Sequence, residues 1–523
     1  MDDTPLQAAL DRLADADILL VQGLPPDADY RFKHALIQDA AYENLLKSRR
    51  QILHRRVAET LRERVAAGAG PEPELLAHHL TQAGLTEDAV EWWGKAGQRS
   101  LERFALTEAV AQFTRALDQV ASLPATPAHR CEQIKLQVGL ANAVYHTKGM
   151  AATETRAAFD QARVMIEQAE SLGEHVEDPL LLYSVLYGFF IAKFIKFDGD
   201  TACALARQFL ALAEQQKAMA PVMIGHRLLG VTLLCMGDPA EGLSHIDRAL
   251  AFYDPAVHRP LATRFGHDVG AAALTFRPLA LWLLGYPTTA LLETSRARDA
   301  ARETDHIPTL LLTLNSTALA HICCRDHAAA AVHLDECITL AQGKSPFMKG
   351  FATIGRGCVL AQTGKASDAI QEISTGAAEL RAIGAAVWGT SAFCHLARAY
   401  AELGKFDDAW HSIGEAITAV ETTKERWGEP EVHRTAGEIA LMSPQRDTAK
   451  AQEYYDRALK VARQQKAKSW ELRAAMSLAR LWRDQGKVQQ ARGLLAPVYG
   501  WFTEGIDTLD LKEAKALLEE LAA

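Results

Sequence analysis

The stretch that decides the fold is residues 396–417, LARAYAELGKFDDAWHSIGEAI. On both sides of Gly404, small and apolar residues recur at the spacing of one face of a helix. A glycine can take the left-handed conformation that ends a helix. The alanines Ala397, Ala409 and Ala416 leave room for two helices to approach closely. The stretch therefore predicts a hairpin of two helices.

This hairpin recurs at a nearly constant interval. The alanine that follows each turn is Ala369, Ala409, Ala451 or Ala491, so successive copies are 40, 42 and 40 residues apart. A fixed period of this size is typical of a solenoid built from stacked helical hairpins. The order of small, aromatic, glycine and alanine residues resembles tetratricopeptide repeats, whose usual period is about 34 residues. Each helix is therefore expected to be longer than usual by most of a turn.

Composition narrows the class of protein. The chain has 523 residues, 49% of them hydrophobic and 7% aromatic, and its formal net charge of −9 disfavours general affinity for nucleic acid. The eight cysteines lack CxxC spacing, which favours free thiols in a reducing compartment. The first residues have no signal-peptide pattern, and the longest apolar run, residues 179–192, is too short to cross a bilayer. We therefore expect a cytoplasmic protein with no membrane contact and no nucleic-acid partner.

Three parts are expected along the chain. Residues 1–70 combine a short amphipathic helix, a β-hairpin and two further helices. Residues 71–265 are expected to form a first set of helical repeats, and residues 266–523 a more regular set that ends in a capping helix. The predicted fold class is all-α: a tetratricopeptide-like helical-hairpin solenoid with a small N-terminal module.

Two segments resemble a particular family. The first is YRFKHALIQDAAY at 30–42, and the second is AKSWELRAA at 467–475, continued by LWRDQG at 481–486 and VYGWFTEG at 498–505. Together they are similar to the C-terminal half of large bacterial proteins that join an adenylate/guanylate cyclase domain, a STAND-type signalling ATPase and a tetratricopeptide array. The resemblance covers essentially the whole chain. It implies that residues 1–70 are the remnant of a winged-helix module and that the repeats are a sensor.

The resemblance also implies a departure from that family. The cyclase and ATPase precede the first segment there, whereas about thirty residues precede it here, so we expect a truncated or split relative with no catalysis of its own. The favoured function is a protein-interaction or signal-sensing repeat module. One alternative is a regulatory fragment of an adenylate cyclase system that acts with a separate ATPase or cyclase chain. The other is a winged-helix transcription regulator, which Asp11, Asp15 and Asp17 disfavour because carboxylates repel phosphate.

No catalytic, cofactor-binding or metal-binding residue is predicted. The GKS at 343–345 lacks the glycine that a phosphate-binding loop needs five residues earlier, where Ile338 stands. One cluster has spacings seen in zinc sites: His321, Cys323, Cys324, His327, His333 and Cys337. We favour the interpretation that these residues pack in the seam between helices, because buried cysteine behaves as a small hydrophobe.

A recognition groove is expected over residues 180–325. In a curved solenoid one helix of each pair lines the concave side, and here the first helices carry the candidate contacts Tyr183, Tyr187, Arg277, Trp282 and Asn315. Aromatic and arginine side chains supply most of the binding energy at interfaces. The aromatic stripe that begins at Tyr183 has two interpretations, a packed core or the lining of an apolar ligand site. The expected partner is a protein or peptide, with a small-molecule signal as the alternative; the oligomeric state is not predicted.

Overall fold

The computed structural model describes residues 3–23, 28–66, 72–149, 152–174, 178–387 and 389–522. In these ranges the chain is an all-α repeat solenoid, as predicted, apart from one two-stranded sheet. It divides into two compact units, residues 1–97 with 112–124 and residues 98–111 with 125–523. The three-part division at residues 70 and 265 stays a prediction. No helix in the described part of the chain combines the length and the apolar character needed to span a membrane.

The first unit begins with the predicted β-hairpin between short helices. Strand β1 (Leu19–Gln22) follows helix α1 (Asp3–Asp15) and pairs antiparallel with β2 (Asp29–Phe32), so that Leu19 lies opposite Phe32. The helices that follow are α2 (Ala35–Glu43), α3 (Lys47–Ala66), α4 (Pro73–Ala83), α5 (Thr86–Glu102) and α6 (Leu106–Val120). Helix α3 packs on α4 and buries Ala58 and Leu61. The hairpin is confirmed, whereas its assignment to a winged helix stays a prediction.

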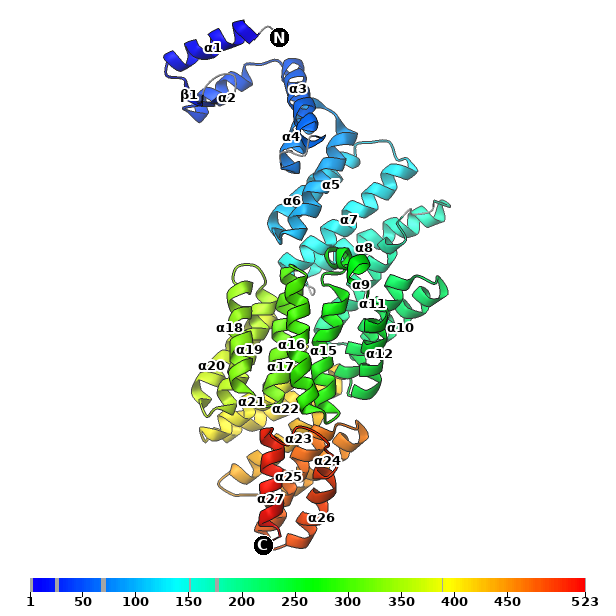
Figure 1. Ribbon diagram of the computed structural model, residues 1–523, viewed down its shortest axis with the longest axis vertical. Helices are drawn as coiled ribbons and strands as arrows, with labels where there is room; N and C mark the ends of the chain where they lie inside the picture. Colours follow the sequence, from blue (N-terminus) through cyan, green and yellow to red (C-terminus); the bar gives the residue numbers. More distant parts are fainter. Residues whose placement is uncertain are drawn as a thin grey trace. The chain divides into compact units, whose positions relative to one another are not determined.

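The second unit is a series of antiparallel helix pairs that Figure 1 shows from cyan through red. The first helices of the pairs are called the inner helices here: α7 (Pro127–Lys148), α9 (Leu180–Lys196), α11 (Met219–Cys235), α15 (Val269–Leu283), α17 (Ile307–Cys323), α19 (Pro346–Gln362), α21 (Gly389–Glu402), α23 (Glu429–Met442) and α25 (Lys468–Asp484). Their partners, called the outer helices, are α8 (Thr153–Ser171), α10 (Gly199–Gln215), α12 (Pro239–Ala251), α16 (Pro287–Glu303), α18 (His327–Ala341), α20 (Ala366–Ala382), α22 (Phe406–Thr423), α24 (Thr448–Gln464) and α26 (Val488–Tyr499). Short helices α13 (Pro255–His258), η1 (Arg259–Leu261) and α14 (Ala262–Phe265) form the irregular connection, and α27 (Leu509–Glu520) ends the series.

The repeated residues act locally as the sequence indicates. Gly404, at the turn between α21 and α22, has a φ of 74°, which costs little for glycine. Several outer helices start at an aspartate whose side chain accepts a hydrogen bond from a backbone N–H three residues later, as Asp238 does from Glu241. The alanines at 369, 409, 451 and 491 are all completely buried. They lie in the seams between paired helices, where a larger side chain would hold the helices apart.

The second unit coils back on itself, so that repeats distant in the sequence touch. The Ser469 hydroxyl at the start of α25 donates a hydrogen bond to the carbonyl of Trp282 at the end of α15, 187 residues earlier. In the same way the backbone N–H of Val387 donates to the carbonyl at the end of α9, and that of Trp427 to Cys235 at the end of α11. The C-terminal ends of α9, α11 and α15 are therefore held by residues at or just before the starts of α21, α23 and α25. The inner helices of both turns face a common interior.

Candidate functional site

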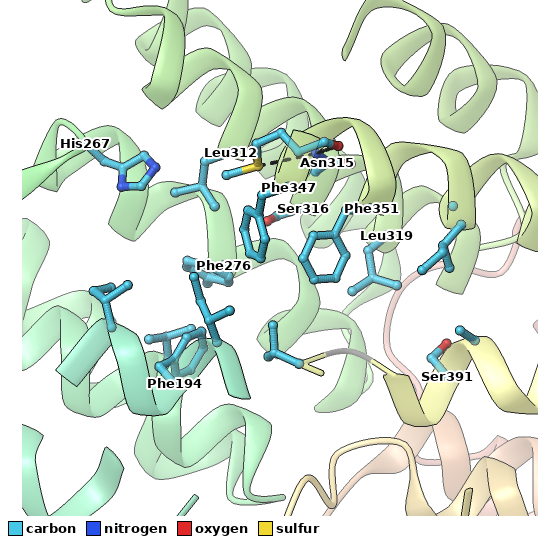
Figure 2. Close-up of a pocket in the computed structure, with 18 of the residues that line it drawn as sticks. Phe194, His267, Phe276, Leu312, Asn315, Ser316, Leu319, Phe347, Phe351 and Ser391 are labelled. Carbon is cyan, nitrogen blue, oxygen red and sulfur yellow. Dashed lines mark hydrogen bonds between the residues drawn. The ribbon is translucent and has the colours of Figure 1, made fainter. Parts of the chain in front are cut away.

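An apolar cavity of about 130 Å³ lies between the inner helices of the second unit. Figure 2 shows Phe276 of α15 and Phe347 and Phe351 of α19 turned toward this space. The apolar lining comes from α9, α11, α15, α17, α19 and the segment before α21: Phe190, Ile191, Phe194, Ile195, Val231, Phe276, Leu312, Leu319, Ile322, Phe347, Phe351, Ile354 and Val387. A cavity of about 150 Å³ is known to hold benzene. The space therefore has room for one aromatic ring or a short aliphatic chain.

A few polar groups interrupt this lining. The Arg227 guanidinium on α11 donates a hydrogen bond from Nη2 to the Tyr187 hydroxyl at 3.0 Å, and Asn315 Nδ2 donates to the Met348 carbonyl at 3.1 Å. Arg227 is 5% exposed, its Nε has no hydrogen-bond partner, and it forms no ion pair with any described residue. His267 is 6% exposed, and its Nδ1 has no partner either. Two residues that line one cavity therefore each have a buried nitrogen without a partner.

The charge in the cavity comes from Arg227. Burial raises the pKa of Tyr145 above its ordinary value, and burial lowers the pKa of His267 well below its ordinary 6.5, with a smaller contribution from Arg227. Both side chains are therefore neutral near pH 7, whereas a guanidinium stays protonated in proteins. The cavity is an apolar space with one buried positive charge.

A second space, the charged groove, measures about 300 Å³ and is lined by α21, α23, α25, α27 and the segment after α17. Its charged residues are Arg325, Arg398, Arg434, Arg473, Arg480, Glu431, Glu438, Asp510 and Glu513. Its ion pairs include Arg434–Glu431 at 2.6 Å, Arg473–Asp510 at 2.7 Å and Arg325–Glu513 at 2.7 Å. Arg398 and Arg480 are paired as well, so every arginine of the groove has a carboxylate partner.

A small space of about 20 Å³ separates the cavity from the groove. It shares Ile322 and Ser391 with the cavity, and His395, Glu431 and Arg473 with the groove. One water molecule needs about 10–15 Å³ of such space. This space therefore has room for about one water molecule.

The five predicted groove residues have different positions. Tyr187 and Asn315 line the cavity, whereas Tyr183 is completely buried and its hydroxyl donates to Gln216 Oε1 at 2.7 Å. Arg277 forms ion pairs with Asp247 and Glu293 and is not part of the cavity lining. Trp282 is 1% exposed and packs against Trp470, with ring centroids 4.7 Å apart. The structure therefore brings two of the five to one cavity, and a contact of any of them with a partner stays a prediction.

Sequence reasoning missed Arg227 and His267. Helix α11 reads MAPVMIGHRLLGVTLLC, which is apolar on all sides except for adjacent His226 and Arg227. A helix of this kind is buried, and arginine is almost never buried without a partner. An arginine within such a helix could therefore have been identified from the sequence as a buried charge. His267 belongs to the irregular connection, where no periodicity assigns a side chain to the interior.

The histidines His321 and His333 of the cluster with zinc-like spacings form hydrogen bonds with neighbouring side chains. His321 Nδ1 lies 3.1 Å from Asp326 Oδ2, and the two ring nitrogens of His333 lie 3.0 Å from Thr317 Oγ1 and 3.2 Å from the Arg298 guanidinium. Burial raises the pKa of Cys337 to about 12, which keeps this thiol protonated. Among the described residues, no three His, Cys, Asp or Glu side chains are grouped so that they could hold a metal ion.

Comparison with known proteins leaves the family open. No family model matches the chain. An uncharacterised protein of Rhizobium meliloti (strain 1021) is 24% identical over 489 residues, which are 91% of this chain and 46% of the relative. This chain thus spans about half the length of that relative.

The solved structures with a similar course of the chain also have low sequence identity and low TM-scores. The hetero-tetramer Cut9–Hcn1 of APC/C has a TM-score of 0.46 at 14% identity and covers 94% of this chain and 99% of its own. A Rap protein complexed with competence and sporulation factor has a TM-score of 0.41 at 12% identity, covering 83% and 99%. A STAND protein with a tetratricopeptide repeat sensor from Pyrococcus horikoshii has a TM-score of 0.36 at 10% identity, covering 79% and 54%. At these TM-scores the likenesses carry no argument about function.

Proposed function

We propose that this chain is a non-catalytic protein-interaction and signal-sensing module that takes an apolar group of its partner into the cavity. The partner is a protein or peptide segment that presents one apolar side chain, or a small-molecule signal of similar size. The observation that supports this proposal is the cavity itself, about 130 Å³ of apolar space between inner helices of successive repeats. A ligand there would contact several repeats at once, so that binding would alter how they pack.

The size of the cavity favours a ligand over a packing defect. Protein interiors are close-packed, with few voids larger than a water molecule. An apolar space of about 130 Å³ is therefore unusual in an interior packed for stability alone. A ligand that fills it would add contacts with the apolar lining.

The place of the module in signalling belongs to the same proposal. The segments 30–42 and 467–505, which resemble STAND-type signalling proteins, support a role beside an ATPase or an adenylate cyclase chain. Affinity purification of the full chain from its native cells, followed by mass spectrometry, tests this role. Recovery of an ATPase or cyclase chain is expected. Recovery of other partners in its place would contradict this part of the proposal.

The binding proposal predicts that filling the cavity blocks ligands. Ser316 is half-buried on α17 and lines the cavity (Figure 2), so Ser316→Phe would place a ring in the space. A library of random dodecapeptides and a set of small apolar compounds are screened against the full chain. Binders of the parent are expected to lose affinity for Ser316→Phe by about tenfold or more, the amount that burial of one apolar side chain provides.

The matched control is Ser295→Phe on the outer helix α16, where Ser295 is exposed. It adds the same ring outside the cavity and is expected to bind as the parent does. Melting curves of both variants check that the fold is retained. Absence of any binder to the parent, or binders that Ser316→Phe does not affect, would overturn the proposed function.

A further inference from the structure

The cavity holds a positive charge that the protein leaves without a counter-ion. Arg227 is 5% exposed, donates one hydrogen bond to the neutral hydroxyl of Tyr187, and has no carboxylate partner among the described residues. Buried charges in proteins are normally paired, because desolvating an isolated ion is costly. The charged groove of the same unit obeys this rule, since its arginines Arg325, Arg434 and Arg473 each lie within 2.7 Å of a carboxylate.

We infer that the cavity is a site for a small apolar monocarboxylate whose carboxylate lies against the Arg227 guanidinium. This inference rests on the proposed function, because it requires that the cavity binds a ligand, and it adds the class of that ligand. Arg227 lines the cavity and is 5% exposed, with no carboxylate partner among the described residues. The guanidinium N–H groups are donors and keep their positive charge. A carboxylate against this guanidinium therefore supplies the missing counter-charge.

The geometry favours a single carboxylate over other anions. The planar guanidinium fork matches a carboxylate with two parallel hydrogen bonds. Arg227 is the one arginine or lysine among the described residues that line the cavity, so a doubly charged phosphate would remain partly uncompensated. The rest of the lining is aliphatic and aromatic, which requires an apolar body.

The size of the space favours a free small acid over the end of a peptide. A volume of about 130 Å³ accommodates one aromatic ring or a short aliphatic chain. A peptide that placed its C-terminal residue here would have to keep all its other residues outside this volume. The peptide end is therefore kept as a competing outcome of the experiment.

The test compares an acid with its neutral analogue of the same shape. Titration calorimetry on the full chain measures benzoate and benzamide. The parent is expected to bind the acid about tenfold or more tightly than the amide, as charge-assisted hydrogen bonds require. Arg227→Met, which keeps the length of the side chain without its charge, is expected to remove that preference. The matched control is Arg277→Met on α15, whose arginine is ion-paired outside the cavity, and it should keep the preference.

A second readout separates a ligand role from a merely structural one. If Arg227 serves to bind an anionic ligand, Arg227→Met removes an unpaired buried charge, and the ligand-free variant melts at a higher temperature than the parent. If Arg227 serves only to hold α9 through Tyr187, the variant melts at a lower temperature, and that result would overturn the inference.

The remaining outcomes also decide the matter. Equal binding of acid and amide, both lost in Ser316→Phe, would overturn the carboxylate and leave the proposed function standing. Binding of both that Ser316→Phe does not change would remove the proposed function as well. A peptide that ends in a free phenylalanine carboxylate and binds while benzoate does not would overturn the small acid as the ligand.

Discussion

The apolar cavity and the charged groove lie in the same unit and are built from the same kind of element, yet they treat buried charge in opposite ways. In the groove, Arg434 is 8% exposed and pairs with Glu431 and Glu438. In the cavity, Arg227 is 5% exposed and meets a tyrosine hydroxyl. The repeat scaffold fixes which positions face the interior. Individual residues decide whether the buried charges of a space are paired within the protein or need a ligand as counter-ion.

The largest expected effect comes from Arg434→Met in the groove. The substitution leaves Glu431 and Glu438 without their guanidinium, and breaking a buried ion pair from one side costs about 3–5 kcal/mol. We therefore expect a large drop in the urea midpoint of unfolding, measured by circular dichroism. The same change at Arg227 is expected to act in the opposite direction, which makes the pair of variants the sharpest test of the comparison.

Two further variants control this result. Arg457→Met removes an exposed ion pair with Glu453, and such pairs contribute little, so its midpoint should match that of the parent. Arg434→Met combined with Glu431→Gln should recover part of the loss, because one buried carboxylate has been neutralised. If Arg434→Met is as harmless as Arg457→Met, the groove does not depend on its own ion pairs, and the contrast with the cavity fails.

A smaller effect is expected at the wall between the two regions. Trp470 lines the small space of about 20 Å³ between the cavity and the groove and packs on Trp282. Its indole nitrogen donates a hydrogen bond to the Trp427 carbonyl at 2.9 Å. Trp470→Phe keeps an aromatic ring but leaves that buried carbonyl unpaired, which costs about 1–3 kcal/mol. The urea midpoint should fall accordingly. Trp410→Phe on the outer helix α22, where the indole is partly exposed, should change it less, and equal midpoints for the two variants would mean that this link between turns adds no stability.

The sequence predicted the local helical structure of both regions but not the contacts between repeats that lie far apart in the sequence. The alanines Ala369 and Ala409 recur in register, and each marks a helical hairpin because only a small residue fits the seam. The contact between Trp282 and Trp470 depends on curvature that accumulates over the intervening repeats, and no local pattern carries that information. Repeat periodicity therefore gives the elements and their pairing, while the closure of the coil must come from the structure.

The candidate site was predictable only in part for the same reason. Tyr183 and Tyr187 stand four residues apart on one face of α9, yet the first is sealed beside Gln216 and the second borders the cavity. Helical periodicity cannot separate them, because both positions face inward. Arg227 is different, because a charge within an otherwise apolar helix is visible in the sequence. It marks a buried ion whose counter-charge has to be found.

The smallest expected effect concerns pH, because the two regions should lose stability in different pH windows. Burial opposes ionisation of Glu431, but Arg434 and Arg473 together outweigh burial, and the pKa of Glu431 is lowered from its ordinary 4.5. The stability from that carboxylate is therefore present above about 4.5 and is lost as the pH falls through the lower folded value. Burial lowers the pKa of His267 well below its ordinary 6.5. Below about pH 6.5 the unfolded chain binds a proton there that the folded chain does not, so stability declines with acidification already in that range.

His267→Gln tests this difference at the cavity. Removing the imidazole should reduce the pH dependence of the unfolding free energy between pH 6.5 and 5 by up to about 1.4 kcal/mol per pH unit, the limit for one proton. Urea midpoints at pH 7, 6 and 5 measure it. The decline should become shallower without vanishing, because burial also lowers the pKa of His306 to about 4. His411→Gln, whose side chain is 76% exposed, should behave as the parent. A variant at 267 that keeps the full pH dependence of the parent would mean that this imidazole takes up its proton in the folded cavity, and the cavity would then carry a second positive charge at mildly acidic pH.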